Sequence, residues 1–121
     1  MYNEGTIIAL SSPPGSGAIS IIRLSGDSAI SSTDKYFKAK SGKKLKDCDG
    51  YSLSYGNFII EGEILDEVVI SIYKAPHSYT GEDIVEISCH GSSFVLQTII
   101  GVYIDNGLLP AKPGEIGRAH V

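Results

Sequence analysis

The sequence is poor in cysteine and contains no long apolar run and no excess of basic residues. Its two cysteines, Cys48 and Cys89, are too few for a disulfide scaffold or a four-ligand zinc site. No stretch approaches the roughly 20 apolar residues that cross a bilayer, and the N-terminus lacks the charged and apolar regions of a secretory signal. We therefore expect a cytoplasmic protein without a membrane partner.

The charge balance bears on nucleic-acid binding. The chain has ten lysines and arginines and fourteen acidic residues, which gives a formal net charge of −4. A protein that binds a phosphate backbone over its whole surface depends on basic residues. We therefore expect no such binding and no DNA partner. A local basic patch is still compatible with this net charge. With 121 residues, 42% of them hydrophobic and 20% charged, the chain is expected to form one folded domain.

Five segments have the composition of β-strands, because they are β-branched and apolar or alternate apolar with polar residues. They are residues 6–10, 18–24, 51–60, 64–73 and 84–88. The spacing around Glu61, Gly62 and Glu63 suits a hairpin. Helical spacing of apolar residues predicts helices over 27–37 and 94–104, the second ended by Gly107. The fold class is α+β, with a mixed sheet of about five strands and two to three helices.

Residues 38–50 carry five lysines among small polar residues. This composition favours an exposed, solvated and mobile loop. Contact of the lysines with RNA is the alternative interpretation.

No single segment indicates a reaction by itself, because the sequence has no GxxxxGK[ST], HExxH, CxxC or strand–GxGxxG–helix motif. Arg23 interrupts an apolar strand, so it either faces solvent, which spacing alone favours, or pairs with a carboxylate or an anionic ligand. Glu82, Asp83 and Glu86 form an acidic patch. Such a patch is most often a hydrated edge, and the alternatives are a cation site or an acceptor for ligand N–H groups.

Cys89 and His90 are adjacent, and the two residue types together suggest nucleophilic catalysis. However, successive strand residues point to opposite faces of a sheet, so direct pairing is disfavoured. A structural or helix-capping role is the preferred interpretation.

Three segments together resemble the N-terminal domain of the MnmE (TrmE) family of bacterial tRNA-modification GTPases. They are SPPGSGAISIIRLSG at 12–26, APHSYTGEDIVEISCHGS at 75–92 and AKPGE at 111–115. The first is similar to the family pattern T-P-P-G-x-G…I-[IL]-R-[IVL]-S-G. The second is similar to P-N-S-[FY]-T-G-E-D followed by G/C-H-G, with His77 in place of the asparagine. Their order and spacing match over nearly the whole chain.

The resemblance implies a fold similar to the folate-binding domain of the glycine-cleavage T-protein, a site for 5-formyltetrahydrofolate, and pairing into a homodimer. Arg23 and Glu82 fall on the family's folate-contacting arginine and glutamate. Glu82 would accept hydrogen bonds from the pterin edge, and Arg23 would orient the ligand. We expect no catalytic residue and no metal ligand in this chain.

The resemblance further implies that the full-length protein modifies the wobble uridine of certain tRNAs together with the flavoprotein MnmG (GidA). GTP, magnesium and potassium would bind in a GTPase domain that this chain lacks, so we expect no GTPase or tRNA-modifying activity from the chain alone. A purely structural dimerisation or interaction domain without a ligand is the alternative. A small independent enzyme built around Cys89 and His90 is a third hypothesis.

The last six residues, IGRAHV, match what a widely used sequencing adapter encodes in one frame. We therefore expect the domain to span residues 1–115 and residues 116–121 to be a non-native tail. A natural terminus is the alternative.

Overall fold

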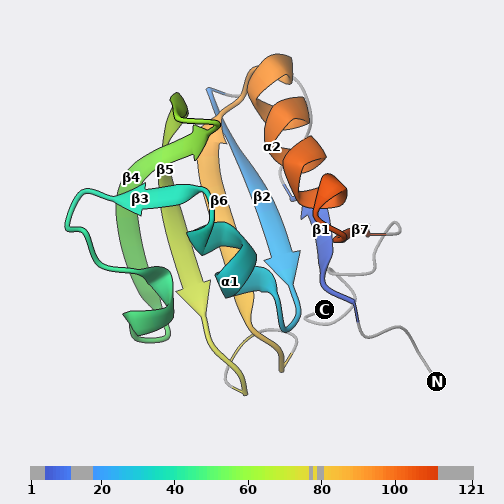
Figure 1. Ribbon diagram of the computed structural model, residues 1–121. Helices are drawn as coiled ribbons and strands as arrows, with labels where there is room; N and C mark the ends of the chain where they lie inside the picture. The colour runs from blue at the N-terminus through green and yellow to red at the C-terminus, as the bar shows by residue number, and fades with distance from the viewer. Residues whose placement is uncertain (1–4, 12–17, 77, 79–80, 112–121) are drawn as a thin grey trace.

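The computed structural model describes residues 5–11, 18–76, 78 and 81–111, which form one mixed seven-stranded sheet and two α-helices (Figure 1). The α+β class is confirmed. The helices are α1 (Ala29–Asp34) and α2 (Ser93–Asp105), and η1 (Leu45–Asp47) is a short 3₁₀ helix. The strands are β1 (Ile7–Leu10), β2 (Ile19–Ser25), β3 (Phe37–Ala39), β4 (Ser52–Ile60), β5 (Glu63–Tyr73), β6 (Ile84–His90) and β7 (Leu109–Pro110), in the order β3-β4-β5-β6-β2-β1-β7.

The sheet is larger than predicted because a short strand lies at each edge. β3 begins at Phe37, where a helix over 27–37 was expected to end. That prediction was wrong at its C-terminal end, since α1 stops at Asp34 and Phe37 pairs with Phe58 of β4 in the core. β7 is two residues long, too short for a sequence signal, and it pairs in parallel with β1.

The predicted hairpin is confirmed. β4 and β5 are joined by a two-residue turn in which Glu61 and Gly62 have φ values of 52° and 82°. Positive φ at both central residues is typical of the type I′ turn, whose twist matches that of the flanking strands.

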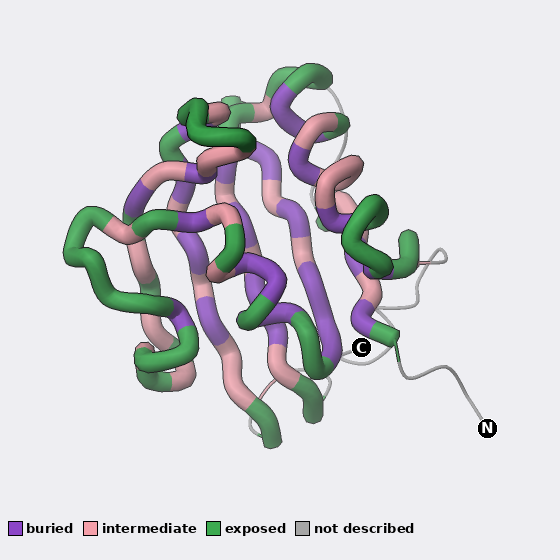
Figure 2. Tube along the Cα trace, in the orientation of Figure 1, coloured by how far each residue is buried: buried purple, intermediate pink, exposed green. Residues whose placement is uncertain are grey.

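The core lies between the sheet and the two helices, which pack on the same face (Figure 1). Buried residues alternate with less buried ones along the central strands, as Figure 2 shows. In β2, Ile22 and Leu24 are fully buried against the helices. Because side chains alternate across a strand, Ile21, Arg23 and Ser25 lie on the opposite face, which the helices do not cover.

The lysine-rich segment 38–50 is more ordered than its composition predicts. Its lysines are exposed as expected, but Leu45 is fully buried. The Asp34 carboxylate accepts the backbone N–H groups of Leu45 (2.8 Å) and Lys46 (3.1 Å). The Lys74 ammonium donates to the carbonyl oxygens of Lys46 (3.2 Å) and Cys48. The segment is therefore anchored to α1 and β5 by its backbone.

None of the helices within the described ranges has the length and apolar character needed to span a membrane. The longer one, α2, has 13 residues. The expected tail at 116–121 and His77 lie outside the described residues.

Candidate functional site

Arg23 lies in the middle of β2, opposite Glu86 of β6. Its Nε donates to Glu86 Oε2 at 2.7 Å, and Nη2 contacts the same oxygen. The two side chains are 15% and 12% exposed, so the solvent-facing interpretation of Arg23 was wrong. The Glu86 carboxylate holds the Arg23 guanidinium along the sheet face that the helices do not cover, because a planar guanidinium hydrogen-bonded to a carboxylate has little rotational freedom.

Glu82 immediately precedes β6 in the chain and is exposed. Its Oε1 accepts a hydrogen bond from the hydroxyl of Ser25 at 2.9 Å. Ser25 follows Arg23 by two residues on β2, so the two side chains lie on one face of the sheet, roughly 6–7 Å apart along the strand. The structure thus brings the two predicted ligand-binding residues, Arg23 and Glu82, to the same part of one sheet face.

The loop that carries Glu82 is anchored by its neighbour. The Asp83 carboxylate accepts the N–H of Ala75 at 2.8 Å, which ties the two ends of the loop together. The Asp83 carbonyl accepts the N–H of Gly26 at 2.9 Å, which ties the loop to the end of β2. These bonds fix the backbone next to Glu82, so its carboxylate is presented from a defined position.

The acidic patch of Glu82, Asp83 and Glu86 is therefore not a simple hydrated edge, because the three carboxylates have three different partners. Sequence reasoning missed Glu86 as the partner of Arg23 and Ser25 as the residue that holds Glu82. Alternation of Ile84, Glu86 and Ser88 did indicate a strand with one polar face. In the described part of the chain, no three His, Cys, Asp or Glu side chains cluster as metal ligands would.

The same face carries exposed apolar side chains on β2 and β4. Ile19 of β2 is 65% exposed, and Leu53 and Tyr55 of β4 are 73% and 48% exposed. By strand alternation all three lie opposite the helices. Leu53 and Tyr55 lie two residues apart on β4, whereas Ile19 lies three strands away on β2, so only the first two can belong to one continuous apolar patch.

Cys89 and His90 do not form a catalytic pair. Cys89 is 3% exposed and belongs to the core. Burial, followed by the negative charge of Asp66, raises the pKa of its thiol to about 11, whereas a nucleophilic cysteine must be a thiolate. His90 is bound instead to Asp66, whose Oδ1 lies 2.6 Å from the His90 Nδ1 and whose Oδ2 accepts the His90 N–H at 2.8 Å.

Cys89 should resist alkylation in the folded chain. Because its pKa lies about two units above that of a free thiol, its thiolate fraction at pH 7.5 should be about 100-fold lower. We expect iodoacetamide to label the partly exposed Cys48 first, as followed by peptide mass spectrometry. In urea both thiols should react at similar rates. Labelling of Cys89 as fast as Cys48 in the folded chain would contradict this picture.

Comparison with known proteins identifies the family. Residues 6–120 match the family model described as GTP-binding protein TrmE N-terminus. The chain belongs to the TrmE N-terminal family. Its curated relatives include proteins named tRNA modification GTPase MnmE from Bacteroides thetaiotaomicron, 48% identical over 114 residues, and from Geobacillus kaustophilus, 43% identical over 120 residues.

The TrmE N-terminal relatives are much longer than this chain. The matched regions cover 93% and 98% of the chain but 24% and 26% of these two relatives. A third, from Flavobacterium johnsoniae, is 44% identical over 115 residues, which are 95% of the chain and 25% of that protein. The chain thus spans about a quarter of the length of the relatives it matches, and the resemblance found from the sequence motifs is confirmed.

Proposed function

We propose that this TrmE N-terminal domain binds 5-formyltetrahydrofolate at Arg23 and Glu82 and pairs with a second copy of itself. One observation carries the proposal. Ser25 holds the Glu82 carboxylate two residues along β2 from Arg23, on the sheet face that the helices leave uncovered.

The donors and acceptors at this site fit a reduced pterin. A pterin edge offers adjacent N–H groups, which one carboxylate can accept together, and Glu82 is exposed at the rim of the face. Arg23 can donate to a carbonyl or carboxylate of the ligand, and Glu86 holds the guanidinium in orientation. Ile21, two residues from Arg23 on the same face of β2, supplies an apolar surface for the ring system.

For the full-length protein, the folate supplies the one-carbon unit for wobble-uridine modification of tRNA in the cytoplasm, together with MnmG. GTP, magnesium and potassium bind in a separate GTPase domain. The relatives are named tRNA modification GTPase MnmE, which supports the role in tRNA modification and the presence of a GTPase. The present chain has no phosphate-loop motif, so we expect it to bind folate without hydrolysing GTP.

Calorimetric titration of the chain with 5-formyltetrahydrofolate, together with its mass in solution, tests the proposal. We expect saturable binding by a dimer. A folded chain that binds no folate would overturn the ligand assignment, and a monomeric mass at micromolar concentration would overturn the homodimer.

A structural dimerisation domain without a ligand is the second candidate. The exposed apolar residues Ile19, Leu53 and Tyr55 favour it, because they suit packing against a second copy whether or not a ligand binds. Dimerisation without folate binding would select this alternative.

A further inference from the structure

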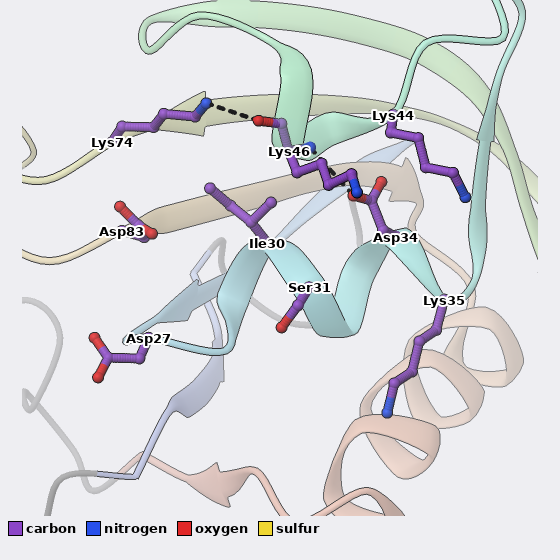
Figure 3. A pocket seen from close by; sticks show the side chains of 9 residues that line it. All are labelled: Asp27, Ile30, Ser31, Asp34, Lys35, Lys44, Lys46, Lys74 and Asp83. Carbon is purple, nitrogen blue, oxygen red and sulfur yellow. Dashed lines mark hydrogen bonds between the residues drawn. The ribbon is translucent and has the colours of Figure 1, made fainter.

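A groove lies beside α1, on the helix-covered face of the sheet, and one end of it reaches Asp83, next to Glu82. It has a volume of about 640 Å³, with Ile30 and Ser31 of α1 on one wall. Figure 3 shows Asp27 and Asp83 at one end and three lysines, Lys35, Lys44 and Lys46, at the other. One wall thus comes from α1 and the opposite one from the lysine-rich segment around η1.

The three lysines are available to a ligand. All are exposed, and in the part of the chain that the structure describes no carboxylate lies within ion-pair distance of any of them. Asp34, which lines the same end, directs both carboxylate oxygens to the backbone N–H groups of Leu45 and Lys46. The fourth lysine of the groove, Lys74, donates to backbone carbonyls.

The basic charge of the chain is concentrated in the segment that forms one wall of this groove. Residues 35–46 contain six of the ten basic residues and no acidic residue. The rest of the chain therefore carries four basic residues against fourteen acidic ones. Such segregation creates a local positive potential on an acidic protein, which attracts and orients a polyanion.

The anchoring of the segment lowers the cost of binding. A mobile lysine loop would lose conformational entropy on contact with a ligand, whereas a segment fixed in advance loses less. Leu45 in the core and the Asp34 and Lys74 hydrogen bonds provide this fixation. A solvated, mobile loop would not have these anchoring contacts.

We propose that this groove binds the phosphate backbone of RNA through Lys35, Lys44 and Lys46. Asp34 lies between Lys44 and Lys46 in Figure 3, so a single compact anion placed among the lysines would meet a carboxylate. Successive phosphates of a chain can contact the lysines on either side of it. The RNA is the tRNA of the proposed function, and the inference rests on that function for this identity.

Fluorescence anisotropy with a labelled, unmodified tRNA transcript tests the groove. The variant Lys35→Gln/Lys44→Gln/Lys46→Gln removes three positive charges but keeps the backbone bonds to Asp34 and Lys74. The matched control, Lys38→Gln/Lys40→Gln/Lys43→Gln, removes the same charge from exposed lysines that do not line the groove. Unfolding of both variants is followed by circular dichroism, so that loss of folding is separated from loss of binding.

The groove variant should bind the transcript about tenfold or more weakly than the unmodified chain, and the slope of log affinity against log salt should fall by about two to three. The control should lose less than about threefold. Equal losses in the two variants, or no tRNA binding by the unmodified chain, would overturn the proposal. Folate titration of the groove variant separates the two sites, since loss of tRNA binding with unchanged folate affinity is expected. A chain that binds tRNA through the groove but no folate would overturn the folate assignment alone.

Discussion

Replacement of Glu82 by alanine is expected to weaken 5-formyltetrahydrofolate binding by about 100-fold or more. A hydrogen bond to a charged group contributes about 1.5–3 kcal/mol, and we assign two such bonds to the carboxylate. Each 1.4 kcal/mol corresponds to about a tenfold change in affinity. Calorimetric titration of the variant, compared with the unmodified chain, measures the loss.

Two further variants test whether the loss of folate affinity is specific to the Glu82 carboxylate and whether it depends on how that carboxylate is positioned. Glu63→Ala removes an exposed carboxylate at the start of β5, far from the site, and should leave folate affinity unchanged. Ser25→Ala keeps Glu82 but removes the hydroxyl that holds it at 2.9 Å, so it should give an intermediate loss of about three- to tenfold. Unchanged affinity in Glu82→Ala would refute the role of this carboxylate.

Replacement of Tyr103 by alanine is expected to lower the free energy of unfolding by about 3–5 kcal/mol, the usual cost of removing a large buried aromatic ring. Tyr103 is completely buried in α2 and lies 6.1 Å from the Phe58 ring and 5.9 Å from the Tyr36 ring, measured between centroids. Its loss would open a cavity where α2, α1 and β4 meet. Urea unfolding followed by circular dichroism measures the change.

The Tyr103→Phe variant isolates the hydroxyl group. This group donates to Thr33 Oγ1 at 2.9 Å, and Thr33 itself donates to the Ala29 carbonyl. Removing the hydroxyl leaves Thr33 with that partner, so the loss should be about 1 kcal/mol. A loss in Tyr103→Ala no larger than in Tyr103→Phe would show that the ring contributes little.

The long elements of the fold were predictable because their periodicity extends over many residues. The hairpin of β4 and β5 and the helix α2 came from alternation and from helical spacing. At Phe37, the apolar periodicity predicted the wrong type of element. Phe37 is buried, as the helical pattern of apolar residues predicted. It belongs to a three-residue strand instead of a helix, because it packs against the sheet.

The sequence supplied the two candidate residues of the proposed site but not the residues that hold them in place. Arg23 and Glu82 came from the resemblance to a family, and the structure places them together. The pairing of Arg23 with Glu86 depends on the register of β2 against β6, a non-local property that neither strand's own sequence contains. The hydrogen bond from Ser25 to Glu82 depends on the same register and on the docking of the loop by Asp83.

The strand at each edge of the described sheet is short. β3 has three residues, and β7 has two, one of them Pro110, which has no N–H to offer a further strand. These two strands therefore offer a neighbouring molecule only a short ladder of backbone groups. Association of two such sheets through their flat surfaces would instead depend on contacts between side chains, so the sequence of the face would select the partner.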